Sequence, residues 1–421
     1  MRPLLLAQSD LQGGAARAAF RLHKAMHGAG HESEMLVRDR YSDFPNVRVL
    51  PSSVSSRAVA ALRSQFGGAI FRLGCSSIGA PRSGNWIPSR VLPVIESYSP
   101  DVVNIHWIGG ETMSIAEIGR IKRPVVWTVH DMWLFCGSEH YTTDSEDSRW
   151  RSGYTADPGT RAELGFDLDR WVWARKKKRW RMPMSVVAPS KWLAKCASAS
   201  ALLREQVVTC IPNPLDTDCF APRNRAFSRE VFGLPEHGFL IAFGAISGQS
   251  DPRKGFDLLR GALSHVRAAY PEIPLHAVVF GQSAPVGAEL PVPVKWLGHL
   301  HDDASLSLLY SAVDVAVVPS RQENLPQSAT EAQACGCPVL AFDCTGLSDA
   351  VAHMETGYLA RPFDVADMAA GVKWLHEDRE RLAVMRHNAR DRALQLWSPN
   401  VVIPQYVEFY ERAIERHRQI R

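Results

Sequence analysis

Two glutamates, Glu323 and Glu331, stand in the stretch of the chain whose pattern best fits a ligand site. Residues 314–338 read as a buried strand, a polar loop that carries Glu323, and a helix that carries Glu331 and stops at Gly336. Free backbone N–H groups and the positive end of such a helix suit a nucleotide diphosphate. Each carboxylate can accept hydrogen bonds from hydroxyl groups, one from a sugar and the other from a ribose. At this spacing alone, two carboxylates without a function are the more frequent outcome.

Basic side chains that can meet a phosphate lie upstream, in Asp251-Pro-Arg253-Lys254-Gly255. This turn falls between a predicted strand and the helix after it. A lysine can approach a pyrophosphate as a point charge, and an arginine can approach it as a planar fork. By itself, however, an Arg-Lys-Gly turn is usually solvated surface.

The first half of the chain contributes a glycine turn, Gly13-Gly14, and histidines that follow two of its predicted strands, His106 and His130. Arg17 lies about one helical turn beyond the glycines, where it meets an anionic acceptor or pairs with a core carboxylate. A histidine after a buried strand is more often structural than functional, so these residues alone do not decide between the two roles.

Short apolar runs alternate with helical patterns along the whole chain, which is typical of βα units that build parallel sheets covered on both faces. At 421 residues the chain also exceeds what one hydrophobic core usually serves. The predicted fold class is α/β, with two doubly wound, Rossmann-like domains. The runs predict strands at 4–7, 102–106, 125–129, 186–189 and 207–211 in the first half, and at 240–244, 275–280, 294–297, 315–318 and 339–342 in the second.

The predicted first domain covers 1–215, the second covers 216–397, and 398–421 form a helix that returns to the first domain. A long polar interval at about 136–165 predicts an inserted loop. The segment at about 213–235, rich in proline and charge, is the predicted linker between the domains.

With these elements in place, the chain resembles the glycosyltransferases of the GT-B fold, specifically the large retaining family numbered four. The shared signature is a strand that ends in Pro-Ser, a glutamate, a second glutamate followed by alanine, and Gly-x-Pro-Val at the end of the helix. This chain has Pro319-Ser320, Glu323, Glu331-Ala332 and Gly336-Cys-Pro338-Val339. The resemblance implies that the two domains face each other across a cleft, that Glu323 contacts the donor sugar and that Glu331 contacts the ribose.

The same resemblance implies roles for further residues. Lys254 would neutralise the leaving diphosphate, His130 would lie at the donor sugar, and Gly13 and Gly14 would let the backbone approach the donor phosphates and the acceptor. The predicted catalytic set is His130, Lys254 and Glu323; the other donor candidates are Arg253, Asn324 and Leu325, and the acceptor candidates are Arg17 and His106. The family commonly has Gly-Arg where this chain has Gly244-Ala245, so Arg253 or another cation must replace that arginine.

These assignments predict a retaining glycosyltransferase that moves a sugar from a nucleoside-diphosphate sugar to a glycan, lipid-linked or small acceptor, in bacterial surface polysaccharide assembly. The departing phosphate would accept the acceptor proton while Lys254 stabilises the developing charge. Because no Asp-x-Asp motif stands in a suitable loop, we expect neither a metal nor a cofactor besides the sugar nucleotide. The alternatives are a sugar-nucleotide epimerase of the same fold, a non-catalytic carbohydrate-binding protein, and a glycoside hydrolase that uses Glu323 and Glu331 as acid and base.

Composition favours a cytoplasmic protein. No apolar run approaches the roughly 20 residues of a membrane span, and the apolar start of the chain is too short for a signal-peptide core. The net charge of +4 is too small to indicate a nucleic-acid partner. The eight cysteines are scattered, so we expect buried free thiols rather than disulfides or metal ligands.

One segment, 167–181, interleaves a basic cluster with tryptophans. Such a helix can rest on anionic lipid headgroups at the inner face of the cell membrane, or hold a lipid-linked or phosphorylated acceptor. The alternative is a solvated helix whose Leu168, Trp171 and Val172 pack on the first domain.

Overall fold

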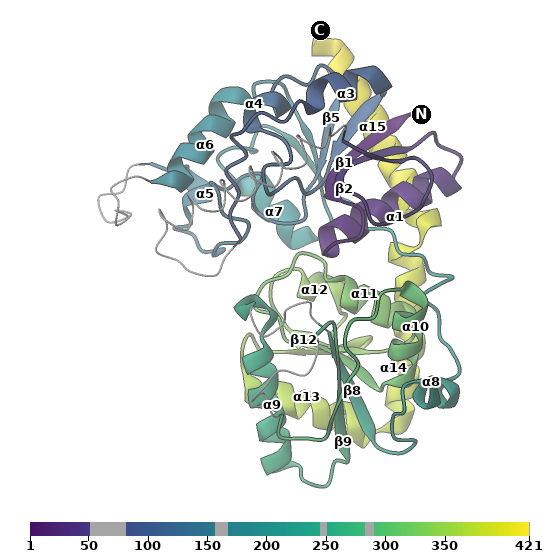
Figure 1. The fold of residues 1–421 in the computed structure, drawn as a ribbon. Coiled ribbons are helices and arrows are strands. Elements are labelled where there is room, and N and C mark those ends of the chain that lie inside the picture. Colours follow the sequence, from purple (N-terminus) through teal and green to yellow (C-terminus); the bar gives the residue numbers. More distant parts are fainter. Residues whose placement is uncertain (51–80, 156–166, 245–250, 283–289, 421) are drawn as a thin grey trace. The chain divides into compact units, whose positions relative to one another are not determined.

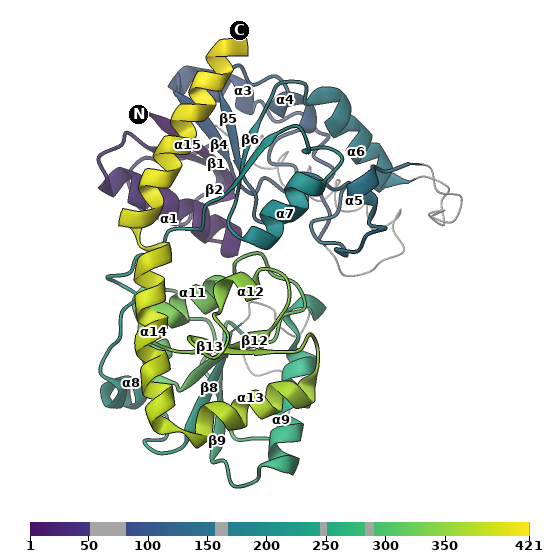
Figure 2. The ribbon, with the colours of Figure 1, turned by 180° about the vertical axis from the view of Figure 1, so that it is seen from behind.

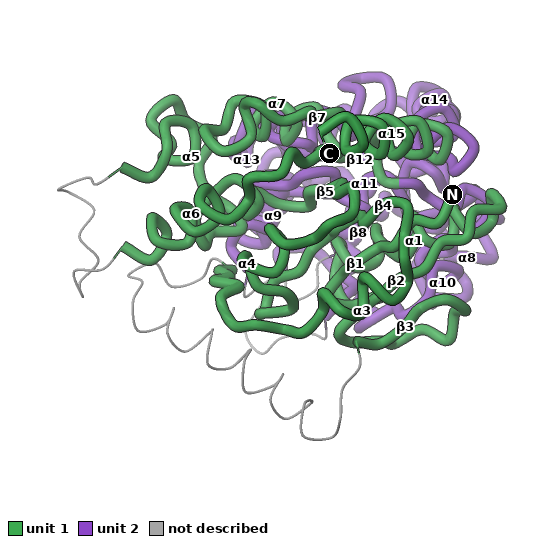
Figure 3. Tube along the Cα trace, turned by 90° about the horizontal axis from the view of Figure 1, so that it is seen from above, with its two compact units in different colours: residues 1–213, 403–421 green, residues 214–402 purple. Residues whose placement is uncertain are grey.

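The computed structural model describes residues 1–50, 81–155, 167–244, 251–282 and 290–420. The chain forms two compact units, which Figure 3 draws in different colours: Met1–Asn213 with Ile403–Arg421, and Pro214–Val402. Each unit has its own parallel sheet and its own hydrophobic core.

The first unit is built on a seven-stranded parallel sheet in the order β3-β2-β1-β4-β5-β6-β7. Its strands are β1 (Pro3–Ser9), β2 (Glu34–Asp39), β3 (Val47–Val49), β4 (Val102–Ile105), β5 (Val125–Thr128), β6 (Ser185–Ala188) and β7 (Val207–Cys210). Its helices are α1 (Gly14–Gly28), α3 (Val91–Tyr98), α4 (Ile115–Ile118), α5 (Arg149–Ser152), α6 (Leu168–Arg179) and α7 (Lys191–Ala199), together with most of α15 (Pro399–Ile420). Figures 1 and 2 show this sheet with helices on both faces.

Alternate residues of the central strands serve the two faces of this sheet. Val103 and Ile105 of β4 point into the main core, whereas Asn104 points to the other face and donates to the Tyr410 hydroxyl of α15 at 2.6 Å. Tyr406, one turn earlier in α15, lies 3.4 Å from the Thr128 hydroxyl. The last helix is therefore held on the sheet by buried tyrosines as well as by apolar packing, and it can be followed along the sheet in Figure 2.

The second unit has a six-stranded parallel sheet in the order β10-β9-β8-β11-β12-β13. Its strands are β8 (Phe239–Gly244), β9 (Leu275–Phe280), β10 (Val294–Trp296), β11 (Val315–Val318), β12 (Val339–Phe342) and β13 (Gly357–Ala360). Its helical segments are α8 (Arg225–Val231), η1 (Pro252–Lys254), α9 (Phe256–Ala269), α10 (Asp303–Ala312), α11 (Gln327–Ala334), α12 (Leu347–Ala350), α13 (Val365–Glu377) and α14 (Arg379–Trp397). One core cluster lies on each face, with α9 and α13 on one side and α10, α11 and α14 on the other (Figure 1).

A buried charge fixes the start of β11. Asp314 is 0% exposed and accepts from the Leu240 backbone N–H at 2.9 Å. Arg225 and Arg229 lie 2.5 Å and 3.0 Å from its two oxygens. Because a buried carboxylate is tolerated only when it is paired and hydrogen-bonded, this cluster joins α8 to two strands of the sheet.

Three strands were not predicted, and the predicted linker is longer than the crossing between the two units, which falls at Asn213 and Pro214. The missed strands β2, β3 and β13 mix charged or small residues with apolar ones, so no continuous apolar run marks them. The segment predicted as a linker at about 213–235 lies almost wholly in the second unit, where α8 packs beside α10. Its polarity reflects the arginines that α8 supplies to Asp314.

The interval predicted as an inserted loop begins in the core of the first unit. Cys136 and Trp150 are fully buried, and α5 lies within the interval. Residues 156–166 lie outside the described part of the chain. Where the structure is described, no helix combines the length and apolarity needed to cross a membrane, and the cysteines are free thiols.

Each sheet has a point where the strand order reverses, and this point is where doubly wound folds bind ligands. In the first unit it lies between β1 and β4, and in the second it lies between β8 and β11. The predicted site residues follow these four strands and their neighbour β5. The fold therefore places them at the carboxyl edges of the two sheets.

Candidate active site

Lys254 and Glu323 meet at the switch point of the second sheet. Lys254 ends η1 after β8, and Glu323 lies in the loop between β11 and α11. The Lys254 Nζ lies 2.6 Å from Glu323 Oε1, and the Ser320 hydroxyl donates to the same oxygen at 2.9 Å. The Glu323 side chain is 10% exposed and that of Lys254 is 30% exposed. A cation and an anion thus stand together, partly shielded from water, where the fold binds ligands.

The loops that carry this pair are locked to one another by backbone contacts. Gly255, which follows Lys254, has a φ of 67°, and a Cβ there would collide with the Pro319 carbonyl oxygen. The Arg321 N–H donates to the Arg253 carbonyl at 2.7 Å. On the other side, the Gly346 N–H donates to the Glu323 carbonyl at 3.0 Å. The position of the Glu323 carboxylate is therefore set by three segments that are distant in sequence.

Glu331 lies further along the same strand-loop-helix unit. It sits on α11, is 4% exposed, and accepts from the Tyr310 hydroxyl at 3.5 Å. This burial excludes a helix-surface carboxylate. Asn324 and Leu325 are also buried, at 7% and 8% exposure. No side chain caps the start of α11, and its first turn carries no acidic residue, so its positive end is not neutralised locally.

The structure gives Arg253 a local partner. Its guanidinium lies 2.5 Å from Asp251, and Asp251 also accepts from the Arg253 backbone N–H at 3.1 Å. Ala245, where the resemblance implies an arginine, lies outside the described residues. The cation that is best placed beside Glu323 is therefore Lys254.

In the first unit, a short loop follows the switch-point strand β1, and Gly13 is the N-cap residue of α1, which begins at Gly14. Gly13 has a φ of 90°, which an L side chain rarely adopts, and its carbonyl accepts from the Arg17 N–H at 3.1 Å. In the described part of the chain no carboxylate pairs with the Arg17 side chain, so the predicted core ion pair is not formed there.

His106 and His130 follow the neighbouring strands β4 and β5, and their rings contact each other. His106 Nδ1 lies 2.9 Å from His130 Nε2, and the rings are inclined by 22°. Burial lowers the pKa of His130 from 6.5 to about 4, although the charge of Asp131 opposes this shift. Burial, and then the charge of His130, hold the pKa of His106 well below its usual value. Both rings are therefore neutral at physiological pH.

Behind His130 lies a polar network that the sequence pattern did not reveal. The Asp131 carboxylate contacts His140 Nδ1 at 2.6 Å and accepts from Trp107 Nε1 at 2.8 Å, and His140 Nε2 lies 2.8 Å from the Ser83 hydroxyl. Burial alone would raise the pKa of Asp131, but the charge of His140 and these hydrogen bonds lower it. In the sequence, only the adjacency of His130 and Asp131 hinted at this network. That adjacency does not show that the Asp131 carboxylate contacts His140 and Trp107.

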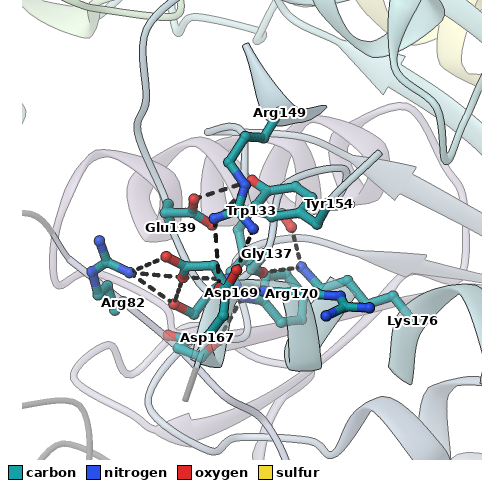
Figure 4. A network of polar contacts seen from close by, with 12 residues as sticks. Arg82, Trp133, Gly137, Glu139, Arg149, Tyr154, Asp167, Asp169, Arg170 and Lys176 are labelled. Carbon is teal, nitrogen blue, oxygen red and sulfur yellow. Dashed lines mark hydrogen bonds and ion pairs between the residues drawn. The ribbon is translucent and has the colours of Figure 1, made fainter. Parts of the chain in front are cut away.

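A second polar network lies beneath α6 (Figure 4). Lys176 is fully buried, and its ammonium donates to the backbone carbonyls of Trp133, Cys136 and Gly137. Burial lowers its pKa from 10.5 to about 7. Burial, and then the charge of Asp169, raise the pKa of Glu139 to about 7. The network fixes the path of the chain just after His130 and Asp131.

The basic-aromatic segment 167–181 mostly packs on its own unit. Leu168, Val172 and Trp173 are buried, and Trp171 packs edge-on against Trp86. The Trp180 ring donates to the Ile115 carbonyl at 3.0 Å. Of the tryptophans in this segment none remains on an open face. Among the basic residues of the helix, Arg170 near its start and Lys177, Lys178 and Arg179 at its C-terminal end are exposed.

The comparisons with known proteins agree with this architecture. The family model for glycosyl transferases group 1 matches residues 225–392, and the model for glycosyltransferase family 4 matches residues 12–219. The fold is that of the GT-B glycosyltransferases. A sucrose-phosphate synthase from Thermosynechococcus elongatus has a TM-score of 0.67 at 18% identity, with 99% of this chain and 100% of the other covered. Anabaena Alr3699/HepE, solved with UDP-glucose, has a TM-score of 0.63 at 18% identity, with 97% and 98% covered.

Curated relatives extend the match to the sequence. A D-inositol 3-phosphate glycosyltransferase of Thermobispora bispora is 30% identical over 356 residues, which are 79% of this chain and 76% of the relative. That of Jonesia denitrificans is 26% identical over 93% of this chain and 90% of the relative. The D-inositol 3-phosphate glycosyltransferase 2 of Catenulispora acidiphila is 34% identical over 50% of this chain. The match spans about half of that relative's length, 52%. The chain belongs to the group 1 glycosyltransferases, family 4.

Proposed function

We propose that this protein transfers a sugar from a nucleoside-diphosphate sugar to an acceptor hydroxyl with retention of configuration. The observation that carries the proposal is the Lys254–Glu323 pair at the switch point of the second sheet, with Ser320 on the same carboxylate oxygen. A sugar nucleotide brings both a diphosphate for the ammonium and hydroxyl groups for the carboxylate. On donor binding the ion pair would separate, the Lys254 ammonium would bind the diphosphate, and the Glu323 carboxylate would accept from hydroxyl groups of the donor.

The proposed roles follow from the chemistry of each side chain. Lys254 binds the diphosphate, Glu323 accepts from hydroxyl groups of the transferring sugar, and the buried Glu331 accepts from the ribose. His130, neutral through burial, forms a hydrogen bond to the transferring sugar. HepE, which shares the fold, is a protein solved with UDP-glucose, and a donor of this class is consistent with it.

The proposed step is a same-face substitution. The bond between the anomeric carbon and the diphosphate oxygen breaks, and the acceptor oxygen bonds to that carbon. The acceptor proton passes to an oxygen of the leaving diphosphate, while Lys254 stabilises the negative charge that develops there. No side chain of this chain needs to bond covalently to the sugar.

We also propose that the reaction needs no resident metal ion. The Asp-x-Asp sequences of the chain, at 167–169 and 216–218, are engaged in structural contacts: Asp167 with Arg149, Asp169 with Arg82, and Asp216 with the Cys219 N–H. Lys254 would supply the positive charge that a metal provides in other enzymes. Transfer should therefore continue in excess EDTA, and a loss of rate that Mg²⁺ or Mn²⁺ restores would contradict this proposal.

The acceptor is proposed only by class. The curated relatives are named for D-inositol 3-phosphate, a small phosphorylated polyol. Arg17, at the switch point of the first sheet, suits an anionic group of such an acceptor. Glycan and lipid-linked acceptors, and a place in bacterial surface polysaccharide assembly, stay as the other proposals.

A panel of sugar nucleotides tests the proposal. The true donor should raise the melting temperature of the protein, because it binds the native state. With an acceptor panel of inositol phosphates and glycans, free nucleoside diphosphate should appear only when donor and acceptor are both present. Interconversion of the donor without an acceptor would identify an epimerase. Stabilisation without any turnover would identify a binding protein.

A membrane-surface contact remains a proposal for the basic end of α6. Gly119 lies against the Arg179 carbonyl, so the loop that carries exposed Arg120 and Lys122 adjoins the C-terminal end of α6 at Arg179. Such a basic surface favours anionic lipids. Sedimentation with phosphatidylglycerol vesicles, but not with phosphatidylcholine vesicles, is expected, and exchange of the exposed Lys177, Lys178 and Arg179 for serine should abolish it. Equal sedimentation with both lipids would contradict the proposal.

A further inference from the structure

His130 has a single ring nitrogen left for a ligand. Its Nε2 is taken by His106 Nδ1, 2.9 Å away, and this contact fixes the plane and the rotation of the His130 ring. Any hydrogen bond from His130 to a substrate must therefore use Nδ1. The backbone of His106 is itself fixed, because its N–H donates to the Leu6 carbonyl of the neighbouring strand at 2.9 Å.

His106 is a buried histidine with one unsatisfied ring nitrogen. Its side chain is 1% exposed, and its second nitrogen, Nε2, is buried with no hydrogen-bond partner among the described residues. Native proteins seldom leave a buried polar atom unsatisfied, and each such atom calls for an explanation. An aromatic hydrocarbon ring would fill the same space without this penalty. The unpartnered nitrogen is therefore expected to lower the stability of the fold at this position.

Few charged groups act on the pair formed by His106 and His130. Asp131, next to His130 in sequence, is the charged group that acts on His130, and its carboxylate is held by His140 and Trp107 instead of by His130. The only charged group that shifts the pKa of His106, among the described residues, is His130. The single contact that orients the His130 ring through a side chain is therefore the one from His106, in the described part of the chain.

We propose that His106 is a positioning residue for the transfer reaction, which holds the ring of His130 so that Nδ1 is presented to the transferring sugar. The inference rests on the proposed function for the role of His130. It adds that the two histidines act as one unit: one proton is shared in the Nδ1–Nε2 contact, and the orientation of His130 depends on it.

The test is a double-mutant cycle. His106→Phe keeps a ring of similar size and removes both the contact and the unpartnered nitrogen. Its melting temperature should equal or exceed that of the wild type, while kcat/KM falls on the order of tenfold, as for other residues that orient a functional histidine. In a His130→Ala background the same substitution should change kcat/KM by less than about twofold. His106→Asn, whose amide reaches the Nδ1 position, should restore part of the loss.

A matched control is His23→Phe. His23 is also a fully buried histidine of the first unit, but its Nδ1 is satisfied by the Ser33 hydroxyl at 2.9 Å. This variant should lose stability and keep transfer. If His106→Phe behaves in the same way, or lowers kcat/KM equally in the His130→Ala background, His106 is structural and the proposal is wrong.

A second readout does not depend on turnover. Side-chain ¹⁵N shifts of His130 in the protein without substrate should change on His106→Phe, because Nε2 loses its partner. Unchanged His130 shifts would overturn the positioning role. Failure of every sugar nucleotide to support transfer would instead refute the proposed function, and the ¹⁵N result would still report on the contact.

Discussion

Gly346 tests whether the shape of the Glu323 loop is needed for donor binding. Its φ of −75° suits any residue, so an alanine there adds no backbone strain. However, an added Cβ would lie 1.2 Å from the Asn324 carbonyl oxygen and 3.1 Å from that of Glu323. Since real Cβ contacts essentially never fall below 3.0 Å, the loop must withdraw by about 1.8 Å.

The expected cost of Gly346→Ala has two parts. Overpacking costs roughly 1–3 kcal/mol. The hydrogen bond from the Gly346 N–H to the Glu323 carbonyl contributes about 1 kcal/mol more when it is broken. The free energy of unfolding should thus fall by roughly 2–4 kcal/mol. A displacement of more than 1 Å beside the reacting groups should also lower kcat/KM by roughly 100-fold.

Urea unfolding and donor-concentration kinetics measure the two effects separately. Gly28→Ala is the matched control, because Gly28 lies in α1 and a Cβ there meets nothing within 4 Å. It should leave transfer unchanged and alter stability by at most about 1 kcal/mol. If Gly346→Ala unfolds at the wild-type urea concentration and transfers at the wild-type rate, the interlocking of these loops is not needed for the site.

Three further predictions concern buried titratable side chains. Asp314→Asn should lower the free energy of unfolding by roughly 3–5 kcal/mol, because it leaves Arg229 buried without its partner; a loss under about 1 kcal/mol in urea unfolding would contradict this. Lys176→Met should cost roughly 2–4 kcal/mol, because three carbonyls lose their donor; calorimetry should show the loss, and a more stable variant would show that the buried ammonium is a net burden. Burial lowers the pKa of His23 to about 4, so as the pH falls the unfolded chain binds this proton before the folded protein does. The contribution of His23 to stability is therefore full above pH 6.5 and declines as the pH falls toward 4. Removing it by His23→Phe should reduce the slope of stability against pH between 6 and 4.5 by roughly 1 kcal/mol per unit, and an unchanged slope would refute this origin.

Much of the fold could be predicted because buried parallel strands are continuous apolar runs. The runs at β1, β4, β8 and β11 identified the four strands that border the switch points. The strand β2 was missed because Glu34 and Asp39 bound it and Arg38 interrupts it, while β13 is short and begins and ends with a small residue, Gly357 and Ala360. Pairing in the sheet, not local sequence, makes these segments strands.

The site was predicted in part. The motifs predicted Glu323 and Lys254 as site residues, the parallel fold brings both to one sheet edge, and their roles stay predictions. Residue spacing could not show that the Lys254 ammonium rests on Glu323, since that depends on loop conformation. Lys176 could have been recognised as buried, because it continues the helical stripe of Leu168 and Val172 at intervals of four residues. The contact of His106 with His130 required the register of two neighbouring strands, which no local pattern contains.

The most direct measurement is release of nucleoside diphosphate by the wild type and by Glu323→Gln, each with donor and acceptor. The Gln variant keeps the size of the side chain and removes the charge that pairs with Lys254. We expect donor- and acceptor-dependent release by the wild type and a loss of at least about 100-fold by the variant, which should stay folded by circular dichroism. Equal release by a folded Glu323→Gln protein would contradict a transfer reaction at the Lys254–Glu323 site.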